Sequence, residues 1–388
     1  MVKNENYYDA DKVSVEKIVL QKITDGAATV EMFKRGELTG TSLTGDQVEH
    51  YMQDPEWGQY VTLRDKSSVN FWFFPNFESP NSEFNAFVQN EDFRLALYHA
   101  LDRVTIAQLY NPYDTEDMLT NLICPEDVCY DENGIDYTDY APLKEIKERG
   151  AATYDPALAK EYFEKALSAV TDGSGNIRGA SAGEVKMGRT FSFQTDGKLP
   201  LQLVYVHGAS SDEVSMAQII KMNLEEVFGS ENIEVILSQF TGDKYNDVIA
   251  PGNFDFAYDN YSFKYADPLS QLDRLTTGGA VNDGRYSLPQ FDALVKEASE
   301  KLVASERYEL FAQAEGMLIN GGYIIPWESG GGTYGMTREI PFTAPRGGFG
   351  LSRFKYKGMQ LSEEPISAEQ YKQLEDEFYE QLLKRNAG

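Results

Sequence analysis

Cysteine and histidine are scarce in this sequence, which limits the metal and nucleophile chemistry that it can carry. Two cysteines and three histidines occur among 388 residues. The histidines lie far apart in the sequence, and no HExxH or CxxC spacing is present. Nucleophile motifs and Gly-rich phosphate loops are also missing. The sequence therefore predicts no metal site, no cofactor and no enzyme.

The two cysteines, Cys124 and Cys129, are separated by a turn-forming proline and two acids. Two such residues are too few for a metal site. A small loop disulfide and two free thiols remain as alternatives. The disulfide is favoured if the protein resides in an oxidising compartment.

Positive charge is in short supply as well. Lys and Arg number 35 against 62 Asp and Glu, a formal net charge of −27. Such a field repels phosphate backbones and anionic membrane surfaces, so nucleic acid and direct membrane binding are not expected. No apolar run approaches the roughly 18 residues of a membrane helix. The negative charge itself is explained either by solubility or by recruitment of cationic ligands.

The patterns that are present predict an α/β protein, and the length suggests two domains. A strand, a helix and a second strand over 199–206, 212–228 and 233–237 form a βαβ unit. Residues 110–153 and 171–197 lack periodicity and predict loops. Further strands are expected at 13–23, 68–74, 254–261 and 323–327, and further helices at 26–38, 91–109, 155–167, 291–304, 306–319 and 368–384.

Short strings in chain order carry a resemblance to a family. Residues Asp92 to Arg103 are similar to a Val-Arg-x-Ala-Leu-x-x-Ala-Ile-Asp-Arg helix. That helix is typical of the family 5 solute-binding proteins of bacterial ABC importers, which take oligopeptides, dipeptides or nickel. The same order of motifs continues in Lys3 to Asp9, Phe33 to Leu38, Tyr154 to Lys160, Tyr286 to Leu294 and Ile324 to Pro326.

The resemblance implies a two-lobed fold of the periplasmic-binding-protein type, class II, with one lobe incomplete. Residues 1–88 would be the second half of lobe I, 89–328 the second α/β lobe (lobe III of the family), and 329–388 a return to lobe I with a C-terminal helix. The chain would then be the C-terminal portion of such a protein, and a natural short homologue is the alternative. The full-length protein is expected outside the cytoplasm, lipid-anchored at the cell surface. The first residues show no secretion signal, which taken alone indicates a cytoplasmic protein.

A ligand cleft is also implied by the resemblance, because residues 254–268 are similar to the strand-to-loop element that lines it. The expected ligand contacts there are Tyr258, Asn260, Tyr261, Ser262, Phe263 and Lys264. Further candidates follow two other predicted strands: Phe74 and Asn76, and Tyr205 and His207. Core packing is the alternative for the aromatic residues. His207, which precedes a glycine in a predicted loop, is expected to be exposed.

Lys264 departs from the pattern of the family. Peptide-binding members have an aspartate there, which takes the α-ammonium of the peptide. A lysine accepts no hydrogen bond and repels an ammonium. Either Lys264 meets an anionic group of the ligand, or it points to solvent. Asp259 is a candidate substitute carboxylate.

The function implied is therefore reversible capture of oligopeptides or related small ligands in an interlobe cleft. A monomer would then deliver the ligand to an ABC permease in the membrane. A surface receptor or adhesin on the same scaffold is an alternative. A hydrolase that uses paired carboxylates is another, although no motif locates its site.

Overall fold

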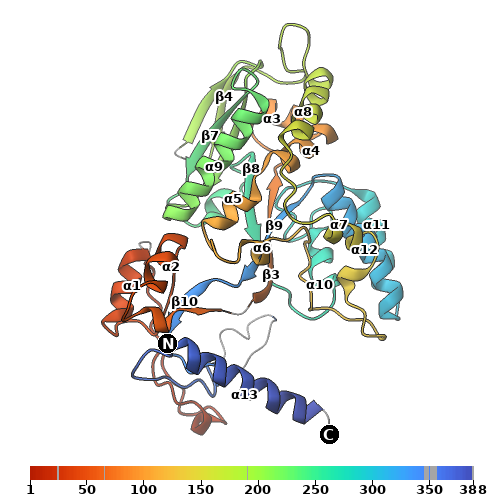
Figure 1. The fold of residues 1–388 in the computed structure, drawn as a ribbon. Coiled ribbons are helices and arrows are strands. Elements are labelled where there is room, and N and C mark those ends of the chain that lie inside the picture. Colours follow the sequence, from red (N-terminus) through yellow and green to blue (C-terminus); the bar gives the residue numbers. More distant parts are fainter. Residues whose placement is uncertain (24–25, 65, 190, 345–348, 350–355, 387–388) are drawn as a thin grey trace. The chain divides into compact units, whose positions relative to one another are not determined.

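The computed structural model describes residues 1–23, 26–64, 66–189, 191–344, 349 and 356–386 (Figure 1). The chain forms two compact units. Unit 1 comprises residues 1–67, 108–114 and 331–388, and unit 2 comprises residues 68–107 and 115–330. The lobe ranges expected from the sequence remain predictions.

Unit 1 is built on a small antiparallel sheet whose strands come from distant parts of the chain. The strand order is β1-β10-β2, with Thr41 opposite Met336. Helix α1 packs against β1, and Val30 and Phe33 of this helix are fully buried. The elements of unit 1 are η1 (Ala10–Lys12), α1 (Gly26–Lys34), β1 (Gly40–Ser42), α2 (Gly45–Met52), η2 (Gly58–Tyr60), β2 (Thr62–Leu63), β10 (Tyr334–Thr337) and α13 (Ala368–Asn386).

The strand predicted at 13–23 is wrong. These residues contain only an isolated bridge between Lys17 and Val2. The alternating pattern is not matched by one-sided burial, since the successive residues Val19 and Leu20 are 70% and 75% exposed. Without a face to bury, the segment lacks the packing that stabilises a strand.

Unit 2 is organised around a mixed five-stranded sheet in the order β7-β6-β8-β3-β9. Strand β6 runs parallel to β7 and β8, whereas β3 runs antiparallel to β8. The predicted βαβ unit is confirmed, with α9 packed on β6 and β7. The strands are β3 (Lys66–Pro75), β6 (Leu201–His207), β7 (Ile233–Gln239), β8 (Phe256–Asn260) and β9 (Ile325–Gly331). The first two residues of β3 and the last residue of β9 belong to unit 1.

Helices surround this sheet (Figure 1). Helix α4 packs on α8, and α11 packs on α12. The helices and helical turns are α3 (Ser82–Val88), α4 (Glu91–Ala100), α5 (Arg103–Gln108), α6 (Thr115–Met118), η3 (Tyr137–Asp139), α7 (Leu143–Glu148), α8 (Pro156–Val170), α9 (Ser211–Phe228), the π-helical turn η4 (Tyr245–Ile249), α10 (Leu269–Leu272), η5 (Asp273–Leu275), α11 (Pro289–Glu300) and α12 (Ala304–Asn320).

Three predictions need correction. The loop expected over 110–153 contains α6, η3 and α7, because tertiary contacts such as the packing of α7 on α12 order segments that lack a sequence period. The helix expected over 91–109 is interrupted at Leu101, which adopts extended backbone angles. Asp102 then caps α5, because its carboxylate accepts hydrogen bonds from the amide and hydroxyl of Thr105. The loop expected over 171–197 contains a hairpin of β4 (Gly183–Met187) and β5 (Phe191–Thr195).

Candidate functional site

The parallel strands of unit 2 place their carboxyl ends at one edge of the sheet. Strand β6 ends at His207 and β8 at Asn260. In open α/β sheets ligands bind outside the carboxyl ends of the strands. We call the polar group that gathers there the carboxyl-edge site; it consists of Glu213, Lys244, Tyr258, Asp259, Tyr261 and Asp283.

Glu213 is positioned by the start of α9. Ser210 caps this helix, and its hydroxyl lies 3.0 Å from Glu213 Oε2. The other carboxylate oxygen accepts a 3.1 Å hydrogen bond from the Tyr258 hydroxyl. A Cβ at Gly208 would lie 2.1 Å from Glu213 Oε2, so the glycine lets this carboxylate approach the backbone. The β6–α9 turn and β8 are thereby joined through one side chain.

Lys244 lies beside β8. Its ammonium donates to the Tyr258 carbonyl at 2.5 Å and lies 3.7 Å from Asp259 Oδ2. The nitrogen is also 4.0 Å from the centroid of the Tyr258 ring. Burial lowers the pKa of Lys244, and the nearby carboxylates of Asp259 and Glu213 act in the opposite direction.

Tyr261 and Asp283 form a second pair at this edge. The Tyr261 hydroxyl donates to the Asp283 carboxylate, and the Tyr261 ring lies 6.2 Å from Trp72. Burial raises the pKa of Asp283 to about 6. The guanidinium of Arg274 lies 5.3 Å from the Tyr261 ring centroid. Together these groups offer aromatic faces and charges of both signs, which suits the binding of a polar small molecule.

The structure brings four of the residues predicted from the sequence to this edge. These are Tyr258, Asn260, Tyr261 and Ser262, which lie within five positions of one another and are all half-buried. The next residue, Phe263, is fully buried. Lys264 is exposed, and its amide donates to the Ser270 hydroxyl at 2.7 Å. A role for any of these six residues in ligand binding remains a prediction.

Phe74 and Asn76 lie at the opposite end of β8. Strand β3 is antiparallel to β8, so the residues that follow it neighbour the beginning of β8. Phe74 packs edge-on against Phe254, and the amide of Asn76 donates to the carbonyls of Gly252 and Phe254. Both side chains are buried, and a ligand contact for either residue remains a prediction.

Tyr205 and His207 are also buried. The Tyr205 hydroxyl donates to the sulfur of Met216 on α9 at 3.4 Å. The expected exposure of His207 is wrong, since this residue is only 6% exposed. It is the last residue of β6 and pairs with Gln239 of β7, so it belongs to the sheet and not to a loop.

Cys124 and Cys129 are buried and carry free thiols in the structure. Burial raises the pKa of both thiols above the usual range. The Glu315 carboxylate nearby accepts hydrogen bonds from the Cys124 amide and the Tyr137 hydroxyl. A disulfide between the two cysteines remains a prediction.

Sequence reasoning missed Lys244, Glu213 and Asp283. The Ser-x-x-Glu spacing of Ser210 and Glu213 is a capping-box pattern that could have marked the start of α9. No sequence signal marks Lys244 or Asp283, because both reach the edge from loops whose course depends on the tertiary fold.

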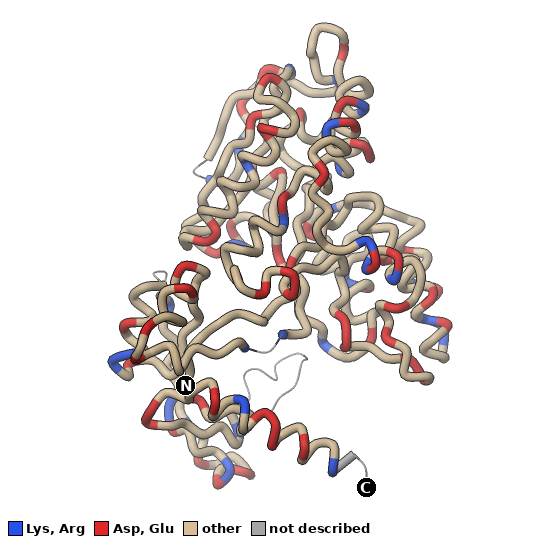
Figure 2. The backbone as a smooth tube through the Cα atoms, viewed as in Figure 1, with Lys and Arg blue, Asp and Glu red and all other residues tan. Residues whose placement is uncertain are grey.

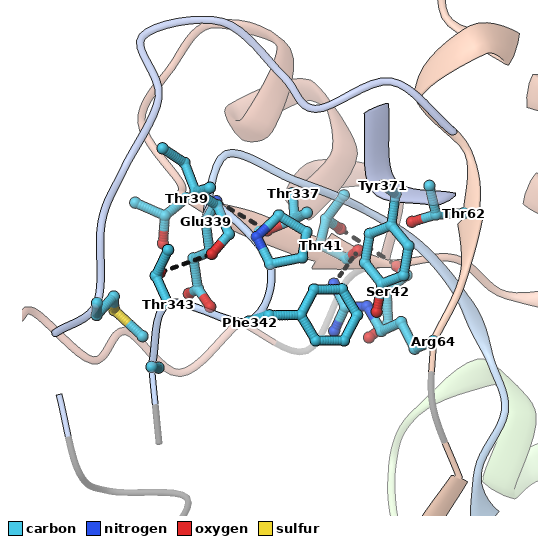
Figure 3. A pocket seen from close by; sticks show the side chains of 15 residues that line it. Thr39, Thr41, Ser42, Thr62, Arg64, Thr337, Glu339, Phe342, Thr343 and Tyr371 are labelled. Atoms are coloured by element: carbon cyan, nitrogen blue, oxygen red, sulfur yellow. Dashed lines mark hydrogen bonds between the residues drawn. The ribbon is translucent and has the colours of Figure 1, made fainter. Parts of the chain in front are cut away.

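The cavities among the described residues include one in each unit that does not contain the residues of the carboxyl-edge site. One of about 570 Å³ belongs to unit 1 and is shown in Figure 3. Arg64 and several threonines line it, and the rings of Phe342 and Tyr371 lie 5.8 Å apart at its side. The other, of about 520 Å³, lies in unit 2 between the β4–β5 hairpin and the segment after β7.

The described residues contain neither a cluster of metal-ligating side chains nor a helix able to span a membrane. Among them, no three or more His, Cys, Asp or Glu side chains are grouped to hold a metal ion. Within the same residues, no helix combines the length and apolar character needed to cross a membrane. Acidic side chains are spread over the helices of both units (Figure 2).

The profile described as "Bacterial extracellular solute-binding proteins, family 5 Middle" matches residues 1–283. The chain belongs to this family. The family predicted from the order of the sequence motifs is therefore confirmed. Family 5 members are extracellular solute-binding proteins by that description.

Similar proteins agree with this family assignment. The oligopeptide-binding protein SarA of Streptococcus gordonii is 25% identical over 99% of this chain and 62% of its own length. The oligopeptide-binding protein AliA of Streptococcus pneumoniae is 25% identical over 99% of this chain and 63% of its own length. The family 5 chain thus spans about three fifths of the length of these relatives.

Solved structures show the same fold. The substrate-binding domain of an oligopeptide ABC transporter from Bacillus anthracis matches with a TM-score of 0.73 and 15% identity, over 93% of this chain and 62% of that one. Listeria monocytogenes OppA bound to peptide matches with a TM-score of 0.71 and 18% identity, over 94% and 61%. The predicted α/β fold of the periplasmic-binding-protein type is confirmed.

Proposed function

We propose that this chain is the solute-binding component of an ABC importer and captures oligopeptides or related small ligands. The observation that carries the proposal is the carboxyl-edge site, where aromatic rings and charged groups from β8, α9 and two loops converge. The names of the relatives support peptides as the ligand class, because SarA and AliA are both oligopeptide-binding proteins.

Binding without catalysis is part of the proposal. The carboxylates of the site are engaged by Tyr258, Tyr261 and Lys244, an arrangement that holds these polar groups in place for binding. We further propose that the protein acts outside the cytoplasm as a monomer, is lipid-anchored at the cell surface, and delivers its ligand to a membrane permease.

Ligand-induced stabilisation tests this proposal. Thermal unfolding is measured with a library of short peptides, with free amino acids and with sugars. Because a ligand that binds only the folded state stabilises it, we expect peptides to raise the melting temperature and sugars to leave it unchanged. The absence of a shift with every peptide would overturn the proposal, and hydrolysed peptides in the mixture would indicate an enzyme instead.

Two variants with the same chemical change at different positions test whether peptide binds at the carboxyl-edge site. Tyr261→Phe removes the hydroxyl that donates to Asp283 and should reduce the peptide-induced shift. Tyr379→Phe makes the same chemical change at a half-exposed position on α13 and should leave the shift unchanged. Equal shifts in both variants would contradict the placement of the site.

A further inference from the structure

Lys244 occupies a cation site made by its neighbours. A carbonyl oxygen at 2.5 Å, an aromatic ring at 4.0 Å and a carboxylate oxygen at 3.7 Å surround its ammonium. Carboxylates, carbonyl oxygens and tyrosine faces are the groups that bind ammonium ions in proteins. The side chain of Lys244 is 21% exposed and that of Asp259 is 20% exposed, so the site borders solvent.

The loop that carries Lys244 is fixed by hydrogen bonds from backbone to side chain. The Asp243 amide donates to Asp247 at 2.8 Å, and the Asn246 amide donates to Asp243 at 2.7 Å. A Cβ at Gly242 would lie 2.1 Å from Asp247 Oδ2, so the turn depends on glycine. The lysine is therefore presented to the carboxyl-edge site from a well-defined turn.

The charges around the lysine are nearly balanced. Asp259, Glu213 and Asp283 are the carboxylates that act on Lys244. Arg285 and Lys244 both act on Asp283, and Asp283 acts on Arg274. A second ammonium brought to this position would meet Lys244 in place of an unpaired carboxylate and would be repelled by it.

Resting on the proposed function, we propose that Lys244 is a specificity-determining residue that fills the ammonium subsite of the carboxyl-edge site with the chain's own cation. The protein should therefore prefer peptides whose amino terminus carries no charge, such as N-acylated peptides, over the same peptides with a free amine.

Paired peptides test the preference. Each sequence is prepared with a free and with an acetylated amino terminus, and dissociation constants are measured by calorimetry. We expect the wild type to bind the acetylated form about tenfold more tightly. Lys244→Met, which keeps the length and removes the charge, should shift the ratio by about tenfold or more towards the free amine.

Lys186→Met serves as the control, because this lysine of β4 is 72% exposed and pairs only loosely, at 3.5 Å, with Glu184. Its ratio should equal that of the wild type. A wild type that prefers the free amine would overturn the inference, and so would a Lys244→Met variant with an unchanged ratio. Both results leave the proposed function intact as long as peptides bind.

Chemical rescue tests the subsite without any peptide. Lys244→Ala removes the ammonium and should unfold at a lower temperature, since the nearby carboxylates of Asp259 and Glu213 lose their counter-ion. Propylammonium should restore the melting temperature of this variant, whereas sodium and tetramethylammonium at equal ionic strength should not. Recovery of folded Lys244→Ala on refolding in propylammonium would give the same support if the variant is unstable. No difference between the three cations would overturn the inference, whatever peptides do.

Discussion

Asp255 lies directly before β8 and is fully buried, and its carboxylate accepts three hydrogen bonds. The donors are the Ser79 hydroxyl at 2.5 Å, the Asn81 amide group at 2.9 Å and the Val204 backbone amide at 2.8 Å. Burial raises its pKa to about 7, although these hydrogen bonds oppose the shift. One carboxyl group thus joins β8, β6 and the loop before α3.

The raised pKa of Asp255 makes stability depend on pH. The folded state holds this proton up to about pH 7, whereas the unfolded chain releases it near pH 4. Its contribution to stability is therefore complete below the unfolded pKa and is lost as the pH rises through the folded pKa. We expect the free energy of unfolding to fall between pH 5 and 7 by up to about 1.4 kcal/mol per pH unit from this group.

Asp255→Asn checks this prediction. The amide keeps an oxygen for Asn81 and Val204 and an N–H for the Ser79 hydroxyl, so the packing is retained. Denaturant unfolding at several pH values should show a shallower slope for the variant. Other buried carboxyls, such as Glu328 with a pKa raised to about 8, remain in both proteins, so the difference isolates Asp255. Equal slopes would show that Asp255 is ionised throughout this range.

Single residues were the least predictable part of the site. The strand pattern correctly marked Phe74 and Tyr205 as strand residues, but periodicity alone does not say whether an aromatic ring faces a ligand or the core. The direction of β3 relative to β8 placed Phe74 at the far end of the sheet. Lys244 could not be found, because its contacts join residues of a loop to a strand 14 positions away.

Helices α7 and α12 approach closely at Gly316. A Cβ at this position would lie 2.4 Å from Pro142 Cγ, which belongs to a rigid ring. Gly316→Ala should therefore destabilise the protein by about 1–3 kcal/mol from overpacking. This outweighs the gain of up to about 1 kcal/mol in helix propensity.

Gly173→Ala is the matched control, because nothing lies within 4 Å of a Cβ built there and its backbone is not left-handed. Its effect on the free energy of unfolding should stay within about 0.5 kcal/mol. Denaturant melts of both variants provide the measurement. A neutral Gly316→Ala would mean that the two helices can separate at little cost.

Elements were predicted well where the periodicity was long and the ends were marked. Helix α8 begins at Pro156, one residue after the predicted start, and the Asp155 carboxylate before it accepts a hydrogen bond from the Leu158 amide. The failures have local causes. Asp102 breaks one helix by capping the next, and the hairpin β4–β5 lies in a polar segment whose strand faces are largely exposed.

At the scale of the whole chain, the order of weak motifs was more informative than any one of them. Strings such as Asp92 to Arg103 identify the family because they recur in sequence order over most of the chain, and the matching profile covers residues 1–283. Net charge and composition could exclude classes of partner but could not place a site. The ligand class depends on side chains that the fold assembles from separate segments.

Hydrogen–deuterium exchange of the whole chain, with and without the peptide that gives the largest thermal shift, tests the central claim most directly. Ligand at the carboxyl-edge site should slow exchange in residues 207–213 and 256–264, since the first segment begins where β6 ends and the second contains the end of β8. Protection confined to residues 337–344, beside the cavity of unit 1, would contradict this account, and so would exchange that is unchanged throughout the chain.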